Sequence, residues 1–417
     1  MTVPAPATRI SNAEWLERPA TRQVFAALAA AGHEARAVGG AVRNTLLGEP
    51  VSDVDLATPA LPEAVMAAAR AAGLKAVPTG IAHGTVTVVS RHIGYEVTTL
   101  RRDVATDGRR AVVAFTADWT EDARRRDFTM NALYCSADGT LHDPVGGLAD
   151  LAARCVRFIG APADRIREDY LRILRFFRFH ATYGQGLAPD AAAVMACVRA
   201  RQGLASLSAE RIASELLRLL VAPHAAAGLR VMLEYGLIGW VLPAVPRLTA
   251  FARLADIERT LGRNPDPMLR LGVLGSHAGE DADRLGERLR LSTTERRHLL
   301  ELVACDPAPD CDWPERDGRR LLYQVGVDAY ARAVLLHWAL AREAPEDQRW
   351  RHLLALPQRW QPQRFPIAGH DLSMLGAQPG PGMGLLLRQI EAEWIAGDFT
   401  MDRDQLLARA RELCTAA

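Results

Sequence analysis

The sequence lacks the cysteine patterns of zinc sites and disulfide frameworks. Its six cysteines are scattered, and none belongs to a C-x-x-C pair. Neither a zinc site nor a set of disulfide bonds is therefore predicted, and the pattern fits a reducing compartment. No apolar run reaches membrane-spanning length, and the N-terminus has no basic-then-apolar signal pattern. We therefore expect a cytoplasmic protein.

A strong charge of one sign and two common phosphate-binding fingerprints are also missing. Lysine and arginine number 50 against 49 acidic residues, a net charge of +1, so binding of nucleic acid would need a local basic face. Neither G-x-x-x-x-G-K-[ST] nor G-x-G-x-x-G occurs, which argues against P-loop and Rossmann folds. The remaining composition, 49% hydrophobic and 24% charged, is that of an ordinary globular protein. The length of 417 residues allows roughly two to four domains or subdomains.

The most informative stretch covers residues 38–58 and reads VGGAVRNTLLGEPVSDVDLAT. A double glycine, Gly39 and Gly40, opens a short helix that is predicted to end near Gly48, with Arg43 on its first turn. Glycines let backbone N–H groups approach an anion, and a helix N-terminus favours negative charge. The stretch therefore predicts a phosphate-binding turn, although a Gly-Gly pair alone usually marks only a turn.

Two aspartates follow in a segment with strand character. Asp53 and Asp55 are two residues apart, so in a strand both carboxylates point from the same face. Adjacent negative charges repel unless a cation lies between them, and Mg²⁺ is the usual cation where a substrate supplies phosphates. A lone D-x-D is also common in turns and calcium-binding loops. With the glycines and Arg43 nearby, the pattern favours phosphoryl or nucleotidyl transfer.

Short strands dominate the following part of the chain. After a helix predicted over Asn12–Gly32 and an Ala-rich helix over Leu61–Ala72 come the strand-like runs LKAVPT, GTVTVVS and IGYEVTTL. They predict an antiparallel or mixed sheet rather than a doubly wound parallel one. Glu96 lies in the third run, on the face opposite the apolar residues. It is either a third metal-site carboxylate or an exposed strand residue.

Two polar segments come next. Arg101–Arg110 is charged and turn-prone and is predicted to be a mobile loop, followed by a strand in AVVAFTADW. In RRRDFTMNALY, Asp127 and Asn131 are one helical turn apart and are predicted to share a helix face. Together with Arg125 and Arg126 they are candidates for binding a ribose and its phosphates. The alternative is that the basic run is only the solvated end of a helix.

From residue 154 onward the sequence is predicted to be helical. The segment RFIGAPADRIREDYLRILRFFRFHATYG is interpreted as a basic amphipathic helix, and LSAERIASELLRLL as another. Clusters of Pro, Gly and Asp near 262–267, 306–314 and 377–384 are predicted to separate the later helices. The remainder shows no pattern that indicates chemistry.

Asp169 and Arg172 are three residues apart in the basic segment, so they are predicted to point from one helix face. A carboxylate acceptor beside a guanidinium donor complements the edge shared by C and A, which offers an exocyclic amine beside a ring-nitrogen acceptor. U and G present the reverse order and would leave desolvated polar groups unpaired. The alternative is a surface ion pair in which Arg172 contacts Asp169 or Glu168.

Five motifs follow one another in order: GGAVRN…DVDLAT, RRDFTMNAL, DPVGGLADL, EDYLRILRFFRF and LSAERIASELL. Together they resemble the class II tRNA nucleotidyltransferase and bacterial poly(A) polymerase family, over about Val38 to Leu220. The resemblance implies an α+β fold with a polymerase-β-like nucleotidyltransferase head, a mixed or antiparallel sheet, over residues 1–150. It also implies an all-α neck for base recognition and RNA binding over 151–224, and a helical body and tail that bind tRNA over 225–417.

The resemblance also implies residue roles. The catalytic carboxylates would be Asp53, Asp55 and Glu96, with Asp53 and Asp55 holding Mg²⁺, or Mn²⁺ as an alternative. The nucleotide-binding residues would be Gly39, Gly40, Arg43, Arg126, Asp127, Asn131, Asp169, Arg172, Arg175 and Arg178. RNA would lie along the basic helices that carry Arg165, Arg167, Arg175 and Arg178. Arg101–Arg110 corresponds to a flexible loop linked to the switch from C to A addition. One departure is Asn44, where the family usually has aspartate.

The activity that the resemblance implies is CCA addition. C, C and A would be transferred from CTP and ATP to the 3′ end of tRNA without a template, by two-metal nucleotidyl transfer. The expected partners are tRNA, CTP and ATP, with neither a membrane nor a stable protein partner. Alternatives are a poly(A) polymerase, an enzyme that adds only CC or only A, and a non-catalytic RNA-binding module. The His370–Asp371 pair is interpreted as structural rather than as part of a phosphohydrolase site.

Overall fold

The computed structural model describes residues 9–11, 13–107 and 110–416. The chain divides into two compact units, residues 1–241 and 242–417. The first unit holds all the described strands and the first group of helices, and the second is helical. The functional division into head, neck and body at residues 150 and 224 stays a prediction.

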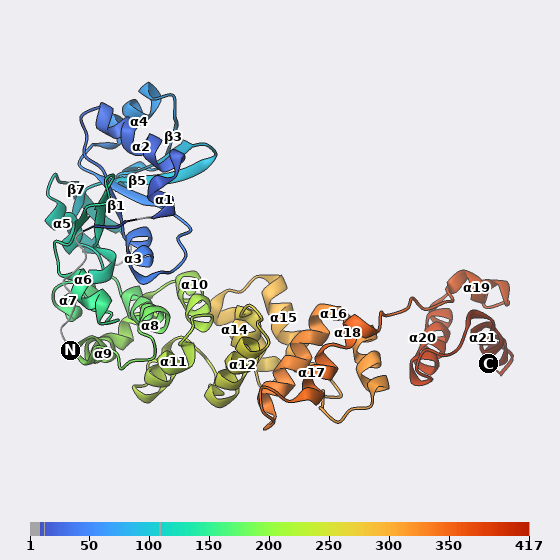
Figure 1. Ribbon diagram of the computed structural model, residues 1–417. Helices are drawn as coiled ribbons and strands as arrows, with labels where there is room; N and C mark the ends of the chain where they lie inside the picture. The colour runs from blue at the N-terminus through green and yellow to red at the C-terminus, as the bar shows by residue number, and fades with distance from the viewer. Residues whose placement is uncertain (1–8, 12, 108–109, 417) are drawn as a thin grey trace. The chain divides into compact units, whose positions relative to one another are not determined.

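A seven-stranded sheet organises the first unit (Figure 1). Its strand order is β3-β4-β5-β2-β1-β8-β9. Neighbouring strands are antiparallel except β2 and β5, which are parallel. The mixed sheet that the sequence predicted is therefore confirmed. The strands are β1 (Arg36–Val38), β2 (Asp55–Thr58), β3 (Lys75–Gly80), β4 (Thr85–Ser90), β5 (Ile93–Thr99), β8 (Tyr134–Ser136) and β9 (Leu141–His142).

Two helices pack beside β4 and β5, namely α2 (Pro19–Ala30) and α4 (Pro62–Ala71). The single helix predicted over Asn12–Gly32 is wrong, because α1 (Glu14–Glu17) ends before α2 begins. Pro19 is the physical reason: it has no N–H for a continuing helix and holds the preceding residue in an extended conformation. The short helix after the double glycine is confirmed as α3 (Gly40–Leu47), and it ends at Gly48 in the left-handed conformation.

The polar segment 101–110 does not form the loop that the sequence predicted. β6 (Arg101–Asp107) pairs with β7 (Arg110–Phe115) as an antiparallel two-stranded sheet, which also confirms the predicted strand in AVVAFTADW. Residues 108 and 109 lie outside the described part of the chain. The predicted mobility of the segment is untested.

The helix predicted across Arg124–Tyr134 is also wrong. α5 (Trp119–Arg124) ends at the first residue of this segment, and only one turn of 3₁₀ helix, η2 (Thr129–Asn131), follows. Asp127 lies in the turn between these two elements. The i,i+4 spacing nevertheless brings it to Asn131, as described below.

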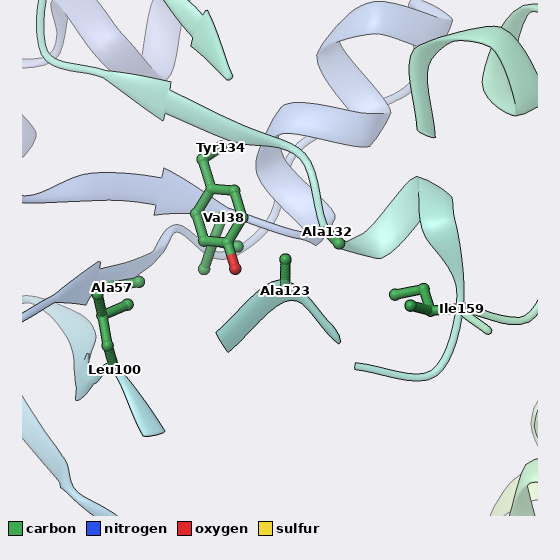
Figure 2. Packing of buried hydrophobic residues seen from close by; sticks show 7 residues of the cluster. All are labelled: Val38, Ala57, Leu100, Ala123, Ala132, Tyr134 and Ile159. Atoms are coloured by element: carbon green, nitrogen blue, oxygen red, sulfur yellow. The ribbon is translucent and has the colours of Figure 1, made fainter. Parts of the chain in front are cut away.

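One core cluster fixes the sheet edge next to the double glycine (Figure 2). Its members come from β1, β2, α5, β8 and the segments beside these elements, and each is at most 5% exposed: Val38, Ala57, Leu100, Ala123, Ala132, Tyr134 and Ile159. Because Val38 is buried directly before Gly39, the turn that opens α3 begins from a rigid strand end.

The basic segment after residue 154 is two helices rather than one. α7 (Pro162–Glu168) and α8 (Leu171–Tyr183) are separated at Asp169, whose backbone is extended with φ −155° and ψ 107°. Asp169 and Arg172 therefore do not share a helix face by their spacing. The other helices of this region are α6 (Gly147–Ala152), α9 (Ala191–Ala200), η3 (Arg201–Ser206), α10 (Ala209–Leu220), α11 (Ala225–Glu234) and η4 (Ile238–Trp240).

The second unit is built from helices α12 to α21, and its joints lie where the sequence predicted them. The gaps after α12, α15 and α19 coincide with the three Pro/Gly/Asp clusters. Asp371 caps α19 by accepting a hydrogen bond from Ala368 N–H at 2.8 Å and pairs with Arg403 at 2.5 Å, which supports the structural interpretation of His370–Asp371.

The helices of this unit are α12 (Leu248–Thr260), α13 (Pro267–Gly275), α14 (Gly279–Leu289), α15 (Thr293–Val303), α16 (Glu315–Leu340), α17 (Gln348–Leu354), α18 (Leu356–Arg359), α19 (Gly369–Met374), α20 (Pro381–Ala396) and α21 (Arg403–Ala416). Among all described helices, none has both the length and the apolarity needed to cross a membrane.

Candidate active site

A cleft of about 470 Å³ lies in the first unit, between the sheet edge and the basic helices. Ten of the thirteen residues predicted from the sequence line it: Gly39, Gly40, Arg43, Asp55, Arg126, Asp127, Asn131, Asp169, Arg172 and Arg175. Asp53, Glu96 and Arg178 are not among its lining residues.

The double glycine forms the turn from β1 into α3. Gly39 has φ +72° and ψ −117°, a conformation that side-chain-bearing residues rarely adopt. A Cβ atom at Gly39 would lie 3.6 Å from the carbonyl oxygen of Asn131 and 3.9 Å from the guanidinium of Arg126. The glycine therefore keeps the backbone close to two cleft residues that lie far away in sequence.

Asp55 begins β2, and Val54 before it is buried while Asp53 and Asp55 are exposed. Asp53 lies in the segment before β2, which begins only at Asp55, so the predicted common strand face of the two carboxylates stays a prediction. β2 runs parallel to β5 with Leu56 opposite Val97, so Asp55 and Glu96 occupy neighbouring positions at the same level. Two of the three predicted carboxylates, Asp55 and Glu96, come from adjacent strands, and Asp53 precedes the first of these strands.

Burial raises the pKa of Asp55, and the charges of Glu96 and Asp53 raise it further, while Arg126 acts in the opposite direction. Neighbouring carboxylates that raise the pKa of Asp55 fit a divalent cation, because oxygen-rich anionic sites are those that Mg²⁺ and Mn²⁺ prefer. The carboxylate oxygens of Asp53, Asp55 and Glu96 do not all lie within 4.8 Å of one another.

Within the described part of the chain, the group whose candidate ligand atoms all lie within 4.8 Å of one another is Asp310, Cys311 and Asp312, in the second unit. Its aspartates are exposed, and one of them pairs with Arg349. This surface cluster is separate from the cleft.

Asp122 was not predicted from the sequence, and it holds two arginines of the cleft. Its side chain is 1% exposed and accepts hydrogen bonds from Arg125 Nε at 2.8 Å, Arg126 Nη2 at 3.1 Å and the Tyr134 hydroxyl at 2.8 Å. Burial alone would raise the pKa of Asp122, but Arg126, Arg125 and the Tyr134 hydrogen bond outweigh it and lower the pKa. Asp122 lies three residues before Arg125 and four before Arg126, and this helical spacing could have predicted the two ion pairs.

Asp127 and Asn131 are brought together as expected, although not by a helix. Asn131 Nδ2 donates to Asp127 Oδ1 at 2.9 Å, and Arg175 donates to Asp127 Oδ2 through Nη2 at 2.5 Å and Nε at 2.8 Å. Burial would raise the pKa of Asp127, and Arg175 with the hydrogen bonds lowers it overall. This buried carboxylate links η2 to α8.

Asp169 and Arg172 both line the cleft, each with a partner of its own. Asp169 Oδ2 accepts from Arg211 Nη2 at 2.7 Å, and its Oδ1 accepts from Leu171 N–H at 3.1 Å. Arg172 Nη1 donates to Glu168 Oε2 at 2.6 Å. The alternative Glu168–Arg172 ion pair is therefore present, and both predicted base-reading groups still face the cleft. Arg211, on α10, lies 42 residues from Asp169, and no local sequence pattern predicts this pairing.

Arg178 lies beyond the cleft lining. Its Nε donates to Glu215 Oε2 at 2.6 Å, and its guanidinium lies 4.5 Å from the Phe179 ring centre. Glu215 is buried, with 4% exposure, and it joins α10 to α8. In this arrangement Arg178 supports the helix that carries Arg172 and Arg175.

Comparisons with known proteins agree over most of the chain. Residues 35–157 match the family model of the poly A polymerase head domain, and residues 186–248 match that of the probable RNA and SrmB-binding site of polymerase A. The mitochondrial CCA tRNA nucleotidyltransferase 1 of Mus musculus is 35% identical over 386 residues, which is 90% of this chain and 86% of the mouse protein.

A bacterial relative and a solved structure point the same way. The CCA-adding enzyme of Lacticaseibacillus paracasei is 34% identical over 390 residues, covering 92% of this chain and 94% of that protein. A crystal structure of the Bacillus stearothermophilus CCA-adding enzyme in complex with CTP superposes with a TM-score of 0.76 at 27% identity. It covers 96% of this chain and 98% of the Bacillus chain.

Proposed function

Because the chain belongs to the family of CCA-adding tRNA nucleotidyltransferases, we propose that the cleft of its first unit is the active site. There C, C and A are transferred from CTP and ATP to the 3′ end of tRNA. One observation carries the assignment of this cleft. Asp55, at the start of β2, lines one cavity together with six arginines and Asp169, which include both predicted base-reading residues.

Enzymes of this kind use divalent metal ions, and we propose that Asp53 and Asp55 hold Mg²⁺, with Glu96 as the third carboxylate. The raised pKa of Asp55 supports this, because a cation would offset the repulsion among the three groups. Mn²⁺ has the same preference for oxygen ligands. Bound ions would lower the pKa of the attacking 3′-hydroxyl and offset charge on the leaving pyrophosphate.

The chain's own side chains would bind and orient the nucleotide. Arg43 and Arg126, with the turn at Gly39 and Gly40, would contact the triphosphate. Asp127 and Asn131 would contact the ribose, although Asp127 is already paired with Arg175, so its free oxygen lone pairs would do so. Positioning and charge stabilisation account for most of phosphoryl-type transfer, which requires little covalent chemistry from the protein.

Base selection would rest on Asp169 and Arg172. An ionised carboxylate only accepts hydrogen bonds, and a guanidinium only donates them. This pair suits the amine and ring nitrogen of C and A, and it leaves unpaired groups with U and G. Glu168 holds Arg172 in the free protein, so base binding would share or replace that contact.

RNA would lie along the basic helices α7 and α8, with Arg165, Arg167, Arg175 and Arg178 as the proposed phosphate contacts. All four arginines pair with carboxylates. Arg167 and its partner Asp164 are the most exposed of these pairs, so Arg167 is the most accessible of the four to a phosphate. We also propose a cytoplasmic location, since all six cysteines are free.

The decisive experiment is incorporation on a tRNA transcript that lacks its 3′-CCA. Each labelled nucleotide is offered alone, and CTP and ATP are then offered together with Mg²⁺, with products resolved at single-nucleotide length. Three additions that stop at CCA support the proposal. Long A tracts would indicate a poly(A) polymerase, and stopping after CC or adding only A would indicate a partial enzyme. No incorporation with Mg²⁺ or Mn²⁺ would leave the RNA-binding module.

A further inference from the structure

The cleft is lined by six arginines, and five of them pair with carboxylates at N–O distances of 2.5 to 3.1 Å. These pairs are Arg125–Asp122, Arg126–Asp122, Arg172–Glu168, Arg175–Asp127 and Arg211–Asp169. Arg43 is the sixth. Among the residues that the structure describes, no carboxylate lies within ion-pairing distance of its guanidinium.

Neutral oxygens hold Arg43 instead. Its Nε and Nη2 donate to Asn44 Oδ1 at 3.1 and 2.9 Å, its Nη2 also donates to the Tyr183 hydroxyl at 2.7 Å, and its Nη1 donates to Asn131 Oδ1 at 2.5 Å. These four hydrogen bonds leave one of the five N–H donors of a guanidinium for a ligand. The side chain is fixed, and its charge is not neutralised by contact.

The ring of Tyr183 also covers this guanidinium. The Arg43 Cζ atom lies 4.3 Å from the Tyr183 ring centre and 5.3 Å from that of Phe179, so the aromatic faces favour the cation without supplying a counter-charge. Arg43 is 7% exposed. Burial lowers the pKa of Arg43, and Tyr183 and the charge of Asp127 offset this only in part. The Asp127 carboxylate is itself in contact with Arg175.

The two neutral partners come from different parts of the first unit. Asn44 follows Arg43 on α3, and Tyr183 ends α8, 140 residues from Arg43. Asn44 is itself oriented, since its Nδ2 donates to the Pro50 carbonyl at 2.8 Å. The amide oxygen therefore faces Arg43 because the amide nitrogen is engaged elsewhere.

We propose that Asn44 and Tyr183 are positioning residues: they fix the Arg43 guanidinium through neutral oxygens, so its positive charge stays available to the nucleotide's phosphates. A carboxylate at position 44, which the family resemblance gives as the usual residue there, would also hold Arg43 but would offset more of its charge than an amide does. Because Asn44 and Tyr183 are neutral, they fix the Arg43 guanidinium without reducing its positive charge. The inference rests on the proposed role of Arg43 in triphosphate binding.

The test measures steady-state kinetics for CTP and ATP, and the dependence of CTP affinity on salt, in the full-length protein with Mg²⁺. Asn44→Asp is nearly isosteric and adds the missing negative charge. We expect its KM for both nucleotides to rise about tenfold, about 1.4 kcal/mol, with kcat within about twofold. Its affinity for CTP should depend less steeply on salt, because one attractive charge has been neutralised.

Tyr183→Phe keeps the ring and removes only the hydroxyl, so its KM should rise by about threefold to tenfold, consistent with loss of a hydrogen bond to a charged group. Its salt dependence should match the wild type, because no charge changes. Tyr235→Phe is the matched control, since Tyr235 is an exposed tyrosine of the same unit, outside the cleft. Tyr235→Phe should leave KM and kcat unchanged.

Asn44→Asp also loses the hydrogen bond to Pro50, and the loop after α3 leads to Asp53. A fall in kcat without a rise in KM would mean that the substitution acts through this loop, and it would overturn the inference. Wild-type KM and salt dependence in Asn44→Asp would overturn it as well.

Arg43→Ala separates this inference from the function on which it rests. If Arg43→Ala raises the KM for CTP strongly and Asn44→Asp does not, triphosphate binding by Arg43 stands, and the inference that Arg43 needs neutral partners is wrong. If Arg43→Ala leaves the KM unchanged, the proposed triphosphate role fails and the inference fails with it.

Discussion

The substitution Asp122→Asn should disturb the active site and the stability of the first unit together. The Asp122 side chain is 1% exposed, and its carboxylate accepts hydrogen bonds from Arg125, Arg126 and the Tyr134 hydroxyl. Asparagine keeps the shape, removes the charge and turns an N–H₂ group toward these donors. Two guanidinium groups that are 15% and 18% exposed would lose their counter-charge.

Breaking a buried ion pair by removing one partner costs about 3–5 kcal/mol. Because the two arginines keep some solvent contact, we expect about 2–4 kcal/mol for Asp122→Asn. Tyr134→Phe removes one hydrogen bond to the same carboxylate and should cost about 1–2 kcal/mol. Comparing the losses in free energy of unfolding of the two variants tests whether the charge of Asp122, rather than the packing around it, provides the stabilisation.

Urea unfolding measures the cost, with hydrogen–deuterium exchange of α5 and β8 reporting the first unit separately, because a chain of two units need not unfold in one step. The pH dependence is a second readout. The folded pKa of Asp122 is lowered, so its stabilisation is present above the unfolded pKa of about 3.9 and is lost as pH falls through the folded value. The difference between wild type and Asp122→Asn should therefore shrink below about pH 4.

Arg126 lines the cleft, so Asp122→Asn should also raise the KM for CTP in protein that remains folded. Unchanged stability together with an unchanged KM would refute the conclusion that Asp122 positions Arg126. A loss of stability with wild-type kinetics in the folded fraction would restrict Asp122 to a structural role.

Three further outcomes follow from the site. Arg211→Ala frees the carboxylate that it holds and should lower the kcat/KM preference for CTP over UTP about tenfold, whereas Arg218→Ala, an exposed change on the same helix, should not. Gly203→Ala places a Cβ atom 2.0 Å from Tyr170 Cδ1 and should cost about 1–3 kcal/mol by urea unfolding; a neutral result would mean that Tyr170 moves freely. Because burial and neighbouring carboxylates raise the pKa of Asp55, saturating Mg²⁺ should move the acid limb of the pH–rate profile to lower pH, and EDTA should abolish incorporation. An acid limb that ignores Mg²⁺ would contradict this reasoning.

Local patterns were sufficient for the strands β3, β4 and β5 and for the turn that opens α3. Each of these features depends on residues within a few positions of one another. The short strands β1, β8 and β9 were not predicted, because strands of two or three residues show too few positions of alternation. Two of the errors came where a local signal was present and was outweighed by a longer pattern.

Pro19 marked a helix boundary that the apolar periodicity of residues 12–32 hid. The Asp-Gly dipeptide at 107–108 is a hairpin signal, and the charge of the surrounding residues hid it. At Asp169 no proline or glycine marks the break between α7 and α8. Helical periodicity continues on both sides, so this break could not be predicted from local sequence.

The organisation of the cleft's charges depends on pairs that sequence spacing does not reveal. Arg175–Asp127 spans 48 residues, Arg211–Asp169 spans 42 and Arg43–Tyr183 spans 140. Each joins elements that only tertiary packing brings together. The motifs supply charged residues in excess, and folding decides which of them are neutralised.

This distinction has a consequence for assigning roles to arginines in the cleft. An arginine whose charge is already matched by a buried carboxylate contributes geometry and donors to a ligand, but little net attraction for an anion. By this criterion, Arg126 and Arg175 orient a nucleotide, whereas Arg43 attracts it. Substituting a matched arginine should therefore harm stability as well as kinetics, because it strands its carboxylate partner. Substituting Arg43 leaves only neutral oxygens behind, so its effect should fall mainly on nucleotide affinity.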